Sequence, residues 1–333
     1  MPQLHLPFPA HDPNPAHPQA QAALDTWLDV SGICQSPASR ASLERTRIPL
    51  VTALAYPDAG PAALELLARW AAWTFIIDDQ FDDGPDGQDP SRCADALATF
   101  LPVLDGQTPG GTPPARAFAA TLQDLTAGRS AGFDRMLRSD IAAFLWSYYQ
   151  GLVDQGSGRL PTMAAYRRQR GVTVGAYTWL AAVEIAAGID LPETVRHFSS
   201  FQDLRDAAAQ YAGLHNDLWS LQRDKAAGAF HNAVLLVQHH DRLALQEAIN
   251  AVHAMLTDCV ERMQDAERDL AAQLDAARIT GPARDDVLTC AAGYRKFVRG
   301  CFDYHSQTRR YTAPPAAEGD IPPHRLIAPT RVK

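Results

Sequence analysis

The chain has 333 residues, of which 46% are hydrophobic and 20% are charged. This composition is typical of a folded globular protein with a sizeable core, and it excludes a disordered or fibrous chain. The 30 Lys and Arg residues are outnumbered by 38 Asp and Glu residues, so the formal net charge at pH 7 is -8. This charge disfavours nucleic acid or an anionic membrane surface as the main partner, and leaves small anionic ligands bound by local patches.

The five cysteines are odd in number, widely spaced and without a CxxC pair. They indicate neither a disulfide framework nor a structural zinc site, so a cytoplasmic, reducing location is expected. The first twenty residues hold six prolines and no basic segment followed by an apolar stretch, which argues against a secretory signal. No stretch approaches 18 uncharged apolar residues, so no membrane-spanning helix is expected.

In chain order, a Pro-rich N-terminal arm (1–18) precedes a long segment (19–312) in which apolar residues recur at spacings of three and four. Runs of Val, Ile and Thr with period two are nearly absent, which argues against strands. The pattern predicts one all-α domain of roughly ten helices, followed by a Pro-rich tail (313–333). Breaks rich in Gly and Pro are expected at 36–39, 58–61, 84–90, 106–114, 156–161, 188–192, 228 and 281–282.

The first candidate site is the acidic end of an apolar helix, WTFIIDDQFDD at 73–83. Residues four apart share a helix face, so Asp78 stacks over Asp82 and Asp79 over Asp83. Carboxylates are unfavourable at a helix C-terminus, where the dipole is negative, so a positive group is expected beside them. Hard oxygen ligands suit Mg²⁺. A solvated acidic helix end is the alternative, but the apolar WTFII predicts a buried helix and a cluster at the mouth of a cavity.

The second candidate site is a polar stripe on a later helix. Asn216, Ser220 and Asp224 are spaced by four residues and drift only about 80° around the helix axis. An amide oxygen, a hydroxyl and a carboxylate in one line form another oxygen-ligand set for a hard cation. A polar face of an amphipathic helix is the alternative, and the presence of the first acidic motif favours the metal site.

The two motifs together resemble those of a known family. DDQFDD at 78–83 and NDLWSLQRD at 216–224 resemble the aspartate-rich motif and the NDxxSxx(K/R)E triad of bacterial class I terpene synthases. One departure is Asp224, because the family usually has Glu at that position. The shorter side chain puts the metal affinity in doubt, but not the reaction class.

Three further segments extend the resemblance along the chain. YRRQRGVTVG at 166–175 resembles the YxxxRxxTxG segment of the family, in which the arginine that matches Arg170 senses diphosphate. Gly228 and Asn232 match a GxxxN pattern that follows the triad. Arg310 and Tyr311 resemble the C-terminal RY pair, so the matches run in order from the PFP sequence at 7–9 in the N-terminal arm to Tyr311.

The resemblance implies a single-domain α-helical bundle with a central active-site cavity. It implies a cyclase that ionises a linear prenyl diphosphate and converts the carbocation into a terpene hydrocarbon or alcohol. The implied cofactor is Mg²⁺, with three ions in the closed complex. Two ions are expected on the first motif, with Asp78 as their main ligand, and the third on the second motif. The implied metal ligands are Asp78, Asp79, Asp82, Asp83, Asn216, Ser220 and Asp224.

The same resemblance assigns the groups that bind diphosphate. Arginine side chains suit this task because they donate in pairs to phosphate oxygens. A sensor arginine acts through a linker and an effector residue, which match Thr173 and Val174, although an ordinary helix break there is the alternative. The groups expected to bind diphosphate are Arg170, Arg223, Lys225, Arg310 and Tyr311.

The cavity is expected to have aromatic walls, because π faces stabilise a carbocation by about 1 to 2 kcal/mol per desolvated contact. Phe75 and Phe81 are favoured as substrate-binding walls because they lie on the helix of the acidic motif. Most buried aromatic residues are simply core, so each of the others is an open alternative. These other candidates are Trp146, Tyr149, Trp179, Trp219 and Tyr304.

Several functions compete with the cyclase. A linear prenyltransferase would require a second DDxxD motif and a protonation-initiated cyclase would require DxDD, and the sequence contains neither. A non-catalytic helical protein that binds prenyl diphosphate stays open as the alternative of a different class. Farnesyl diphosphate is the default substrate implied by the resemblance, with geranylgeranyl diphosphate as the alternative. The product is left open, as is the choice between a monomer and a homodimer.

Overall fold

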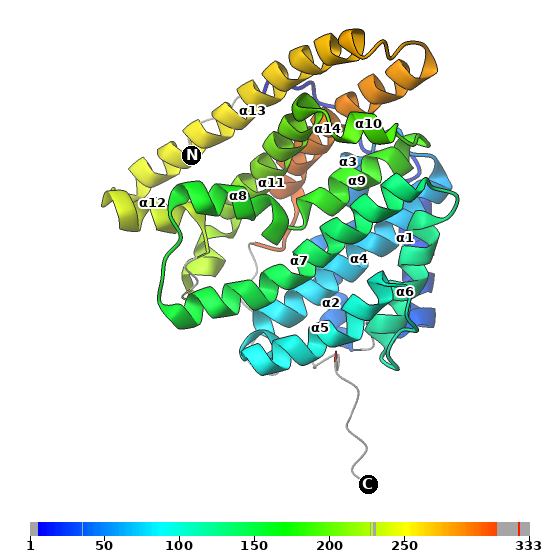
Figure 1. Ribbon diagram of the computed structural model, residues 1–333. Coiled ribbons are helices and arrows are strands. Elements are labelled where there is room, and N and C mark those ends of the chain that lie inside the picture. The colour runs from blue at the N-terminus through cyan, green and yellow to red at the C-terminus, as the bar shows by residue number, and fades with distance from the viewer. Residues whose placement is uncertain (1–5, 35, 227, 229–230, 312–325, 327–333) are drawn as a thin grey trace.

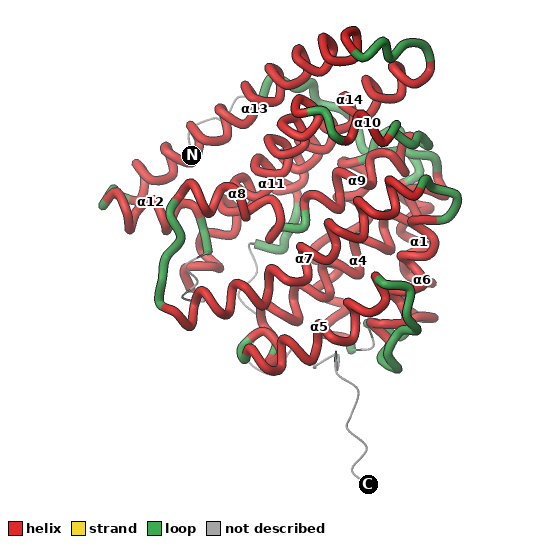
Figure 2. Tube along the Cα trace, viewed as in Figure 1, coloured by secondary structure: helices red, strands yellow, loops and turns green. Residues whose placement is uncertain are grey.

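The computed structural model describes residues 6–34, 36–226, 228, 231–311 and 326, and all regular structure in these ranges is helical (Figures 1 and 2). The all-α prediction is therefore confirmed. The Pro-rich tail, apart from residue 326, lies outside the described residues. None of the described helices is both long and apolar enough to cross a bilayer. The helices are α1 (His17–Ser31), α2 (Pro37–Thr46), α3 (Ile48–Ala55), α4 (Pro61–Asp83), η1 (Pro85–Gly87), α5 (Pro90–Leu104), α6 (Pro113–Thr126), α7 (Ala131–Ser157), α8 (Met163–Thr173), α9 (Ala176–Ala187), α10 (Glu193–Arg196), α11 (Ser199–Ala226), α12 (Ala233–Asp241), α13 (Leu245–Ala276) and α14 (Pro282–Gln307).

Most predicted breaks coincide with helix ends, because proline is favoured at the first position of a helix and glycine just after its last residue. At the start of α5, the Asp89 side chain accepts a hydrogen bond from the Arg92 backbone N–H, and Pro90 occupies the first helical position. Such a start satisfies a backbone donor that has no partner inside the helix. At the end of α9, Gly188 adopts the left-handed conformation with φ 66°, which glycine tolerates without strain.

Some helix breaks carry no glycine or proline signal at the turning residue, and the estimate of roughly ten helices was too low. Arg47 between α2 and α3 has φ 55°, and Arg242 after α12 has φ 53°. A left-handed non-glycine residue costs about 1 to 2 kcal/mol, so contacts elsewhere must hold it. The Arg47 guanidinium donates to the Gln307 carbonyl oxygen at 3.1 Å, which ties this turn to the end of α14.

Two helices lie at the centre of the bundle. α11 packs against α8, α9, α12, α13 and α14, and α4 packs against α1, α3, α6 and α9 (Figure 1). The surroundings of α4 explain why its sequence is apolar nearly all round, since Trp73, Ile76 and Ile77 are all buried. Both candidate motifs therefore lie at the ends of central helices, as the apolar WTFII run predicts for the first.

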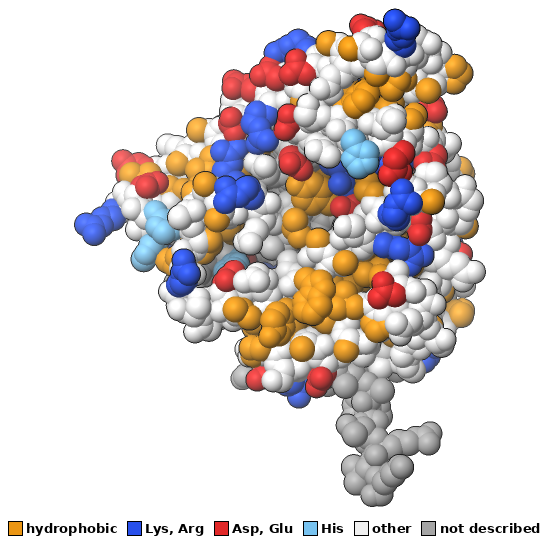
Figure 3. Space-filling view, viewed as in Figure 1, with side chains coloured by type: hydrophobic (Ala, Val, Ile, Leu, Met, Phe, Trp, Pro, Cys, Tyr) orange, Lys and Arg blue, Asp and Glu red, His pale blue; other side chains and the backbone are white. Residues whose placement is uncertain are grey.

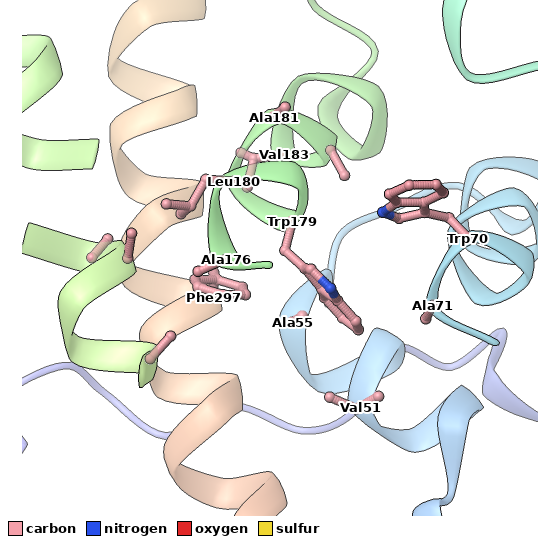
Figure 4. Close-up of a cluster of buried hydrophobic side chains, with 14 of the residues drawn as sticks. Val51, Ala55, Trp70, Ala71, Ala176, Trp179, Leu180, Ala181, Val183 and Phe297 are labelled. Carbon is pink, nitrogen blue, oxygen red and sulfur yellow. The ribbon is translucent and has the colours of Figure 1, made fainter. Parts of the chain in front are cut away.

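A buried apolar cluster joins α9 to its neighbours. Trp179 projects from α9 toward Val51 and Ala55 of α3 and Ala71 of α4 (Figure 4). The Tyr56 hydroxyl donates a 2.8 Å hydrogen bond to the Trp179 carbonyl oxygen. This contact fixes the start of α9 against the end of α3.

Glycine allows close contact between α8 and α11. A Cβ atom at Gly213 would lie 2.5 Å from Cγ of Arg170, and one at Gly171 would lie 2.8 Å from Cβ of Ala209. Real Cβ atoms do not approach other atoms so closely, so these positions accept only glycine at the present helix separation. The contact brings Arg170 of α8 directly against α11.

Apolar side chains gather on the outer face over α5 and α7 (Figure 3). Trp146 of α7 is 49% exposed, and Tyr149 packs edge-on against it with ring centroids 6.0 Å apart. Trp146 is therefore a surface residue, and its interpretation as a cavity wall was wrong. Tyr149 is half-buried and lies on the same side of α7, three residues later.

Candidate active site

The acidic end of α4 meets the residues that follow α14. Arg310 Nη2 lies 3.1 Å from Asp78 Oδ2 and 2.7 Å from Asp79 Oδ1. Arg310 therefore places a positive charge at this end of the helix, where the helix dipole favours one, and Asp78 and Asp79 are ion-paired there. Burial raises the pKa of Asp78, and the positive charge of Arg310 opposes that rise.

Asp82 of the first motif lies farther toward solvent than Asp78 and Asp79. Asp82 Oδ2 is 3.9 Å from Arg223 Nη2 of α11, so an ion pair links the ends of the two central helices. Asp83 is the last residue of α4, and its side chain lies outside what the structure describes. Lys225, on the last turn of α11, is exposed.

The second motif forms a hydrogen-bonded row on α11. The Ser220 hydroxyl donates to Asp224 Oδ2 at 2.6 Å, and the Asn232 amide donates to the same oxygen at 2.8 Å. Asn232 is fully buried at the start of α12 and also donates to the Asp217 carbonyl oxygen. The GxxxN pattern therefore has a structural reason, because Asn232 fixes the shorter carboxylate of Asp224.

Arg170 connects the predicted sensor segment to the second motif. Its Nη2 donates to Asn216 Oδ1 at 2.9 Å, and its Nη1 donates to Thr173 Oγ1 at 3.0 Å. The second hydrogen bond joins the candidate sensor to the candidate linker. α8 ends at Thr173, and Gly175, with φ 71°, begins α9 after Val174. The sensor, linker and effector candidates thus lie at a helix break directly beside α11.

Asp217 is the main site residue that the sequence did not indicate. It is fully buried and accepts hydrogen bonds from Arg170 Nε at 2.8 Å, the Tyr166 hydroxyl at 2.8 Å and the Ala233 backbone N–H at 3.0 Å. Buried charges require such partners. Its place beside Asn216 in the ND pair was the available signal, since one helical step of about 100° turns it toward α8.

Tyr311 joins the chain after α14 to the second motif. The Asn216 side-chain amide donates to the Tyr311 hydroxyl oxygen at 2.7 Å. Arg310 contacts the first motif, so two adjacent residues connect both oxygen-rich motifs. Residues far apart in the sequence thus form one polar network across the ends of α4, α8, α11 and α14.

The donor set of this network fits a hard cation. Within the described part of the chain, no three Asp, Glu, His or Cys side chains lie close enough together to hold a metal ion by themselves. The second motif adds amide and hydroxyl oxygens to the carboxylates. The acidic end of α4 already holds a cationic group, Arg310, between two carboxylates. Mg²⁺ prefers oxygen ligands, and the presence of Arg310 shows that these oxygens accept a positive charge beside them.

Aromatic side chains lie within the acidic motif and one helical turn before it. Phe75 is half-buried, the Arg310 guanidinium lies 5.0 Å from its ring centroid, and Trp179 meets it edge-on at 6.3 Å. Phe81 is buried and stacks on Tyr148. Tyr304 donates to the Thr46 carbonyl oxygen at 2.6 Å, so its hydroxyl serves the core.

Two buried histidines, His215 of α11 and His305 of α14, contact each other beside the network. Nδ1 of His215 and Nδ1 of His305 lie 2.8 Å apart, so one ring donates and the other accepts, which requires an unprotonated acceptor. Trp219 stacks on the same pair, with its ring centroid 6.3 Å from that of His305. Burial lowers the pKa of both histidines, that of His305 to about 3.

This pair is expected to make stability depend on pH. Unfolded histidine has a pKa of about 6.5, so below that pH the unfolded chain binds more protons, and stability falls progressively as pH approaches 3. Protonation of His305 is expected to reduce the free energy of unfolding by about 2 kcal/mol between pH 7 and pH 5, and protonation of His215 acts in the same direction. Urea unfolding at both pH values should show a smaller difference for His305→Gln than for the unchanged protein. Equal differences would contradict the assignment.

Comparison with known proteins places this geometry in a family. Residues 69–262, more than half of the chain, match the model described as terpene synthase family 2, C-terminal metal binding. The (2Z,6E)-hedycaryol synthase of Kitasatospora setae is 30% identical over 315 residues, which cover 93% of this chain and 92% of that protein. The (+)-T-muurolol synthase ((2E,6E)-farnesyl diphosphate cyclizing) of Roseiflexus castenholzii is 32% identical over 236 residues, 69% of this chain and 71% of that protein.

Solved structures agree with the sequence comparison. The linalool/nerolidol synthase from Streptomyces clavuligerus in complex with 2-fluorogeranyl diphosphate superimposes with a TM-score of 0.79 at 25% identity, covering 92% of this chain and 99% of that one. The resemblance inferred from the motifs and the class I all-α fold are thereby confirmed. The chain belongs to terpene synthase family 2, and the protein is a terpene synthase, a carbon–oxygen lyase that acts on phosphates.

Proposed function

We propose that this enzyme is a Mg²⁺-dependent cyclase that ionises farnesyl diphosphate, releases diphosphate and closes the carbocation to a sesquiterpene hydrocarbon or alcohol. The observation that carries this proposal is the polar network in which Arg310 and Tyr311 join the carboxylates of α4 to Asn216 of α11. Carboxylate, amide and hydroxyl oxygens alternate there with guanidinium groups. Such a set can bind metal ions and a diphosphate at one position.

The choice of farnesyl diphosphate rests on the relatives. The name of the Roseiflexus castenholzii protein states that it cyclises (2E,6E)-farnesyl diphosphate. The Streptomyces clavuligerus structure contains a fluorinated geranyl diphosphate, which shows that a similar fold accommodates a prenyl diphosphate. Geranylgeranyl diphosphate is the second candidate substrate, and it would make the enzyme a diterpene cyclase.

The proposal assigns three Mg²⁺ ions to the two motifs. When bound, Mg²⁺ supplies positive charge that stabilises the diphosphate leaving group as the carbon–oxygen bond breaks. The first motif would hold two ions with Asp78 as their main ligand, and the second motif would hold one. The proposed ligands are Asp78, Asp79, Asp82, Asp83, Asn216, Ser220 and Asp224.

The chain's basic groups bind and orient the diphosphate. Arg170 reaches the network from α8, Arg223 from α11 and Arg310 from the residues after α14. Guanidinium groups can donate two parallel hydrogen bonds to phosphate oxygens, and their charge is already fixed in place before the reaction. The hydrogen bond from Arg170 to Thr173 couples diphosphate binding to the helix break at Val174. Lys225 and Tyr311 complete the proposed set.

The hydrocarbon part of the substrate is assigned to the aromatic residues below the network. Phe75 presents a partly exposed ring one helical turn before Asp78, and Phe81 follows three residues after it. A π face near the breaking bond stabilises the allyl cation without reacting with it. Walls of this kind also exclude water, which would otherwise capture the cation.

We extend the proposal to the domain organisation, the cellular location and the oligomeric state of the protein. The catalytic domain spans 19–312, with a Pro-rich arm at 1–18 and a Pro-rich tail at 313–333. The five cysteines are all free, which supports the cytoplasmic location inferred from their number and spacing. A homodimer and a monomer remain the two alternatives for the assembly, and sedimentation of the purified protein distinguishes them.

Incubation with C10, C15, C20 and C25 prenyl diphosphates tests the proposal. Diphosphate release and gas chromatography–mass spectrometry of the extracts should show cyclic C15 products in the presence of Mg²⁺, and none with a chelator. Cyclic products from the C20 substrate alone would replace farnesyl diphosphate by geranylgeranyl diphosphate. Binding of all four compounds without release of diphosphate would overturn the proposed reaction.

Asp224 offers a test of the second motif. Asp224→Ala is expected to lower the rate about 100-fold, because metal ligands and their hydrogen-bond partners typically contribute factors of 10 to 100. Asp224→Glu should retain substantial activity and lower the Mg²⁺ concentration required for half of the maximal rate, since the longer carboxylate extends farther from α11. Equal losses in both variants would show that Asn232 and Ser220 are adapted to aspartate alone.

A further inference from the structure

Tyr148 of α7 contacts the first motif although no motif includes it. Its hydroxyl donates a 3.0 Å hydrogen bond to Asp78 Oδ1. The other carboxylate oxygen, Oδ2, lies 3.1 Å from Arg310 Nη2. Each oxygen of Asp78 therefore has its own donor, and the two donors, Tyr148 and Arg310, are far apart in the sequence.

The ring of Tyr148 is held in place by two other aromatic rings. It stacks on Phe81 with ring centroids 4.4 Å apart and an interplanar angle of 17°, and it meets Phe144 at 5.2 Å and 67°. Phe81 lies on α4, three residues after Asp78. The helix that carries the carboxylate thus also holds the phenol ring that donates to it.

The two contacts define the position of the hydroxyl relative to Asp78. Tyrosine has only two side-chain torsion angles before its hydroxyl, so packing of the ring fixes the donor at little cost in conformational entropy. The Arg310 contact can be exchanged when diphosphate provides another partner, because Arg310 lies beyond the end of α14. Tyr148 lies in the middle of a 27-residue helix, so its contact persists.

We infer that Tyr148 is a positioning residue that holds the Asp78 carboxylate in the orientation required for metal binding. This inference rests on the proposed Mg²⁺-dependent function. Hydrogen bonds to the ligands of a metal set their orientation, and their loss typically costs a factor of about 10 to 100 in metal affinity or activity. Phe81 acts through the same contact, because it supports the ring that carries the donor.

Tyr148→Phe separates this role from simple core packing, because it removes the hydroxyl and keeps the stacked ring. Tyr149→Phe is the matched control, since it makes the same chemical change one residue later, where the ring packs against exposed Trp146. Two quantities are measured for each protein. One is the dissociation constant of Mg²⁺ in the presence of inorganic diphosphate, by calorimetry, and the other is the thermal unfolding temperature without metal.

Tyr148→Phe is expected to raise the Mg²⁺ dissociation constant by about 10 to 100-fold, with an unfolding temperature close to that of Tyr149→Phe. The inference is overturned if both variants bind Mg²⁺ like the unchanged protein, or if both lose affinity equally. Failure of the proposed function looks different, because then the unchanged protein itself shows no binding of Mg²⁺ with diphosphate.

Discussion

Asp78→Asn is expected to lower the rate of diphosphate release by about 1000-fold. The substitution removes one anionic oxygen and the negative charge at the proposed main ligand of two ions. Metal-assisted charge stabilisation contributes several kcal/mol, and roughly 4 kcal/mol corresponds to a factor of 1000 in rate. Asp78 lies at the end of α4 rather than in the apolar core, so the helical fold should be retained.

Product formation and circular dichroism together check this expectation. Asp124→Asn is the control, because Asp124 is half exposed and pairs with Arg69, away from both motifs. The control should leave both the rate and the spectrum unchanged. Near-normal cyclisation by Asp78→Asn would show that the carboxylate does not bind metal, and loss of the helical spectrum would assign it a role in folding instead.

Asp217→Ala is expected to destabilise the protein by about 3 to 5 kcal/mol. Removing one partner of a buried ion pair leaves the other charge without compensation, and Arg170 is 12% exposed at its side chain. The substitution also removes the acceptor of the Tyr166 hydroxyl and of the Ala233 backbone N–H. Diphosphate binding should weaken as well, because Arg170 loses the contact that directs it toward Asn216.

Urea unfolding at pH 7 measures this loss. Asp265→Ala provides the control, since Asp265 and Arg268 form an ion pair on the surface with side chains 64% and 70% exposed. Surface pairs contribute about 0 to 1 kcal/mol, so that variant should unfold almost as the unchanged protein does. A similar small loss for Asp217→Ala would mean that water or another acceptor compensates Arg170.

Local patterns in the sequence were sufficient to predict the helices and the two oxygen-rich motifs. Spacing of four residues places Ser220 and Asp224 in hydrogen-bond contact, as periodicity alone requires. The ends of helices followed from proline, glycine and capping residues. The turn at Arg47 could not be predicted in this way, because its left-handed conformation depends on a contact with Gln307, at the opposite end of the chain.

Contacts between distant helices limited what could be predicted of the site. Tyr148 and Asp78 are 70 residues apart, and nothing in the local sequence distinguishes Tyr148 from Tyr149. Only the orientation of α7 decides which of the two tyrosines meets the acidic motif. For the same reason, Trp146 and Trp179 looked equivalent as candidate walls, whereas the first is on the surface and the second is buried against Phe75.

The close contact at Gly213 has a consequence for how such an enzyme can be changed. Any side chain at this position must either displace Arg170 or separate α8 from α11. Either movement shifts the guanidinium relative to Asn216 while leaving every proposed metal ligand intact. The proposed aromatic walls, such as Phe75, can be exchanged to change the shape of the substrate site, but the junction of these two helices leaves no such freedom. Redesign of the product is therefore best confined to the proposed walls, with the glycine junction kept unchanged because it aligns the groups proposed to bind diphosphate.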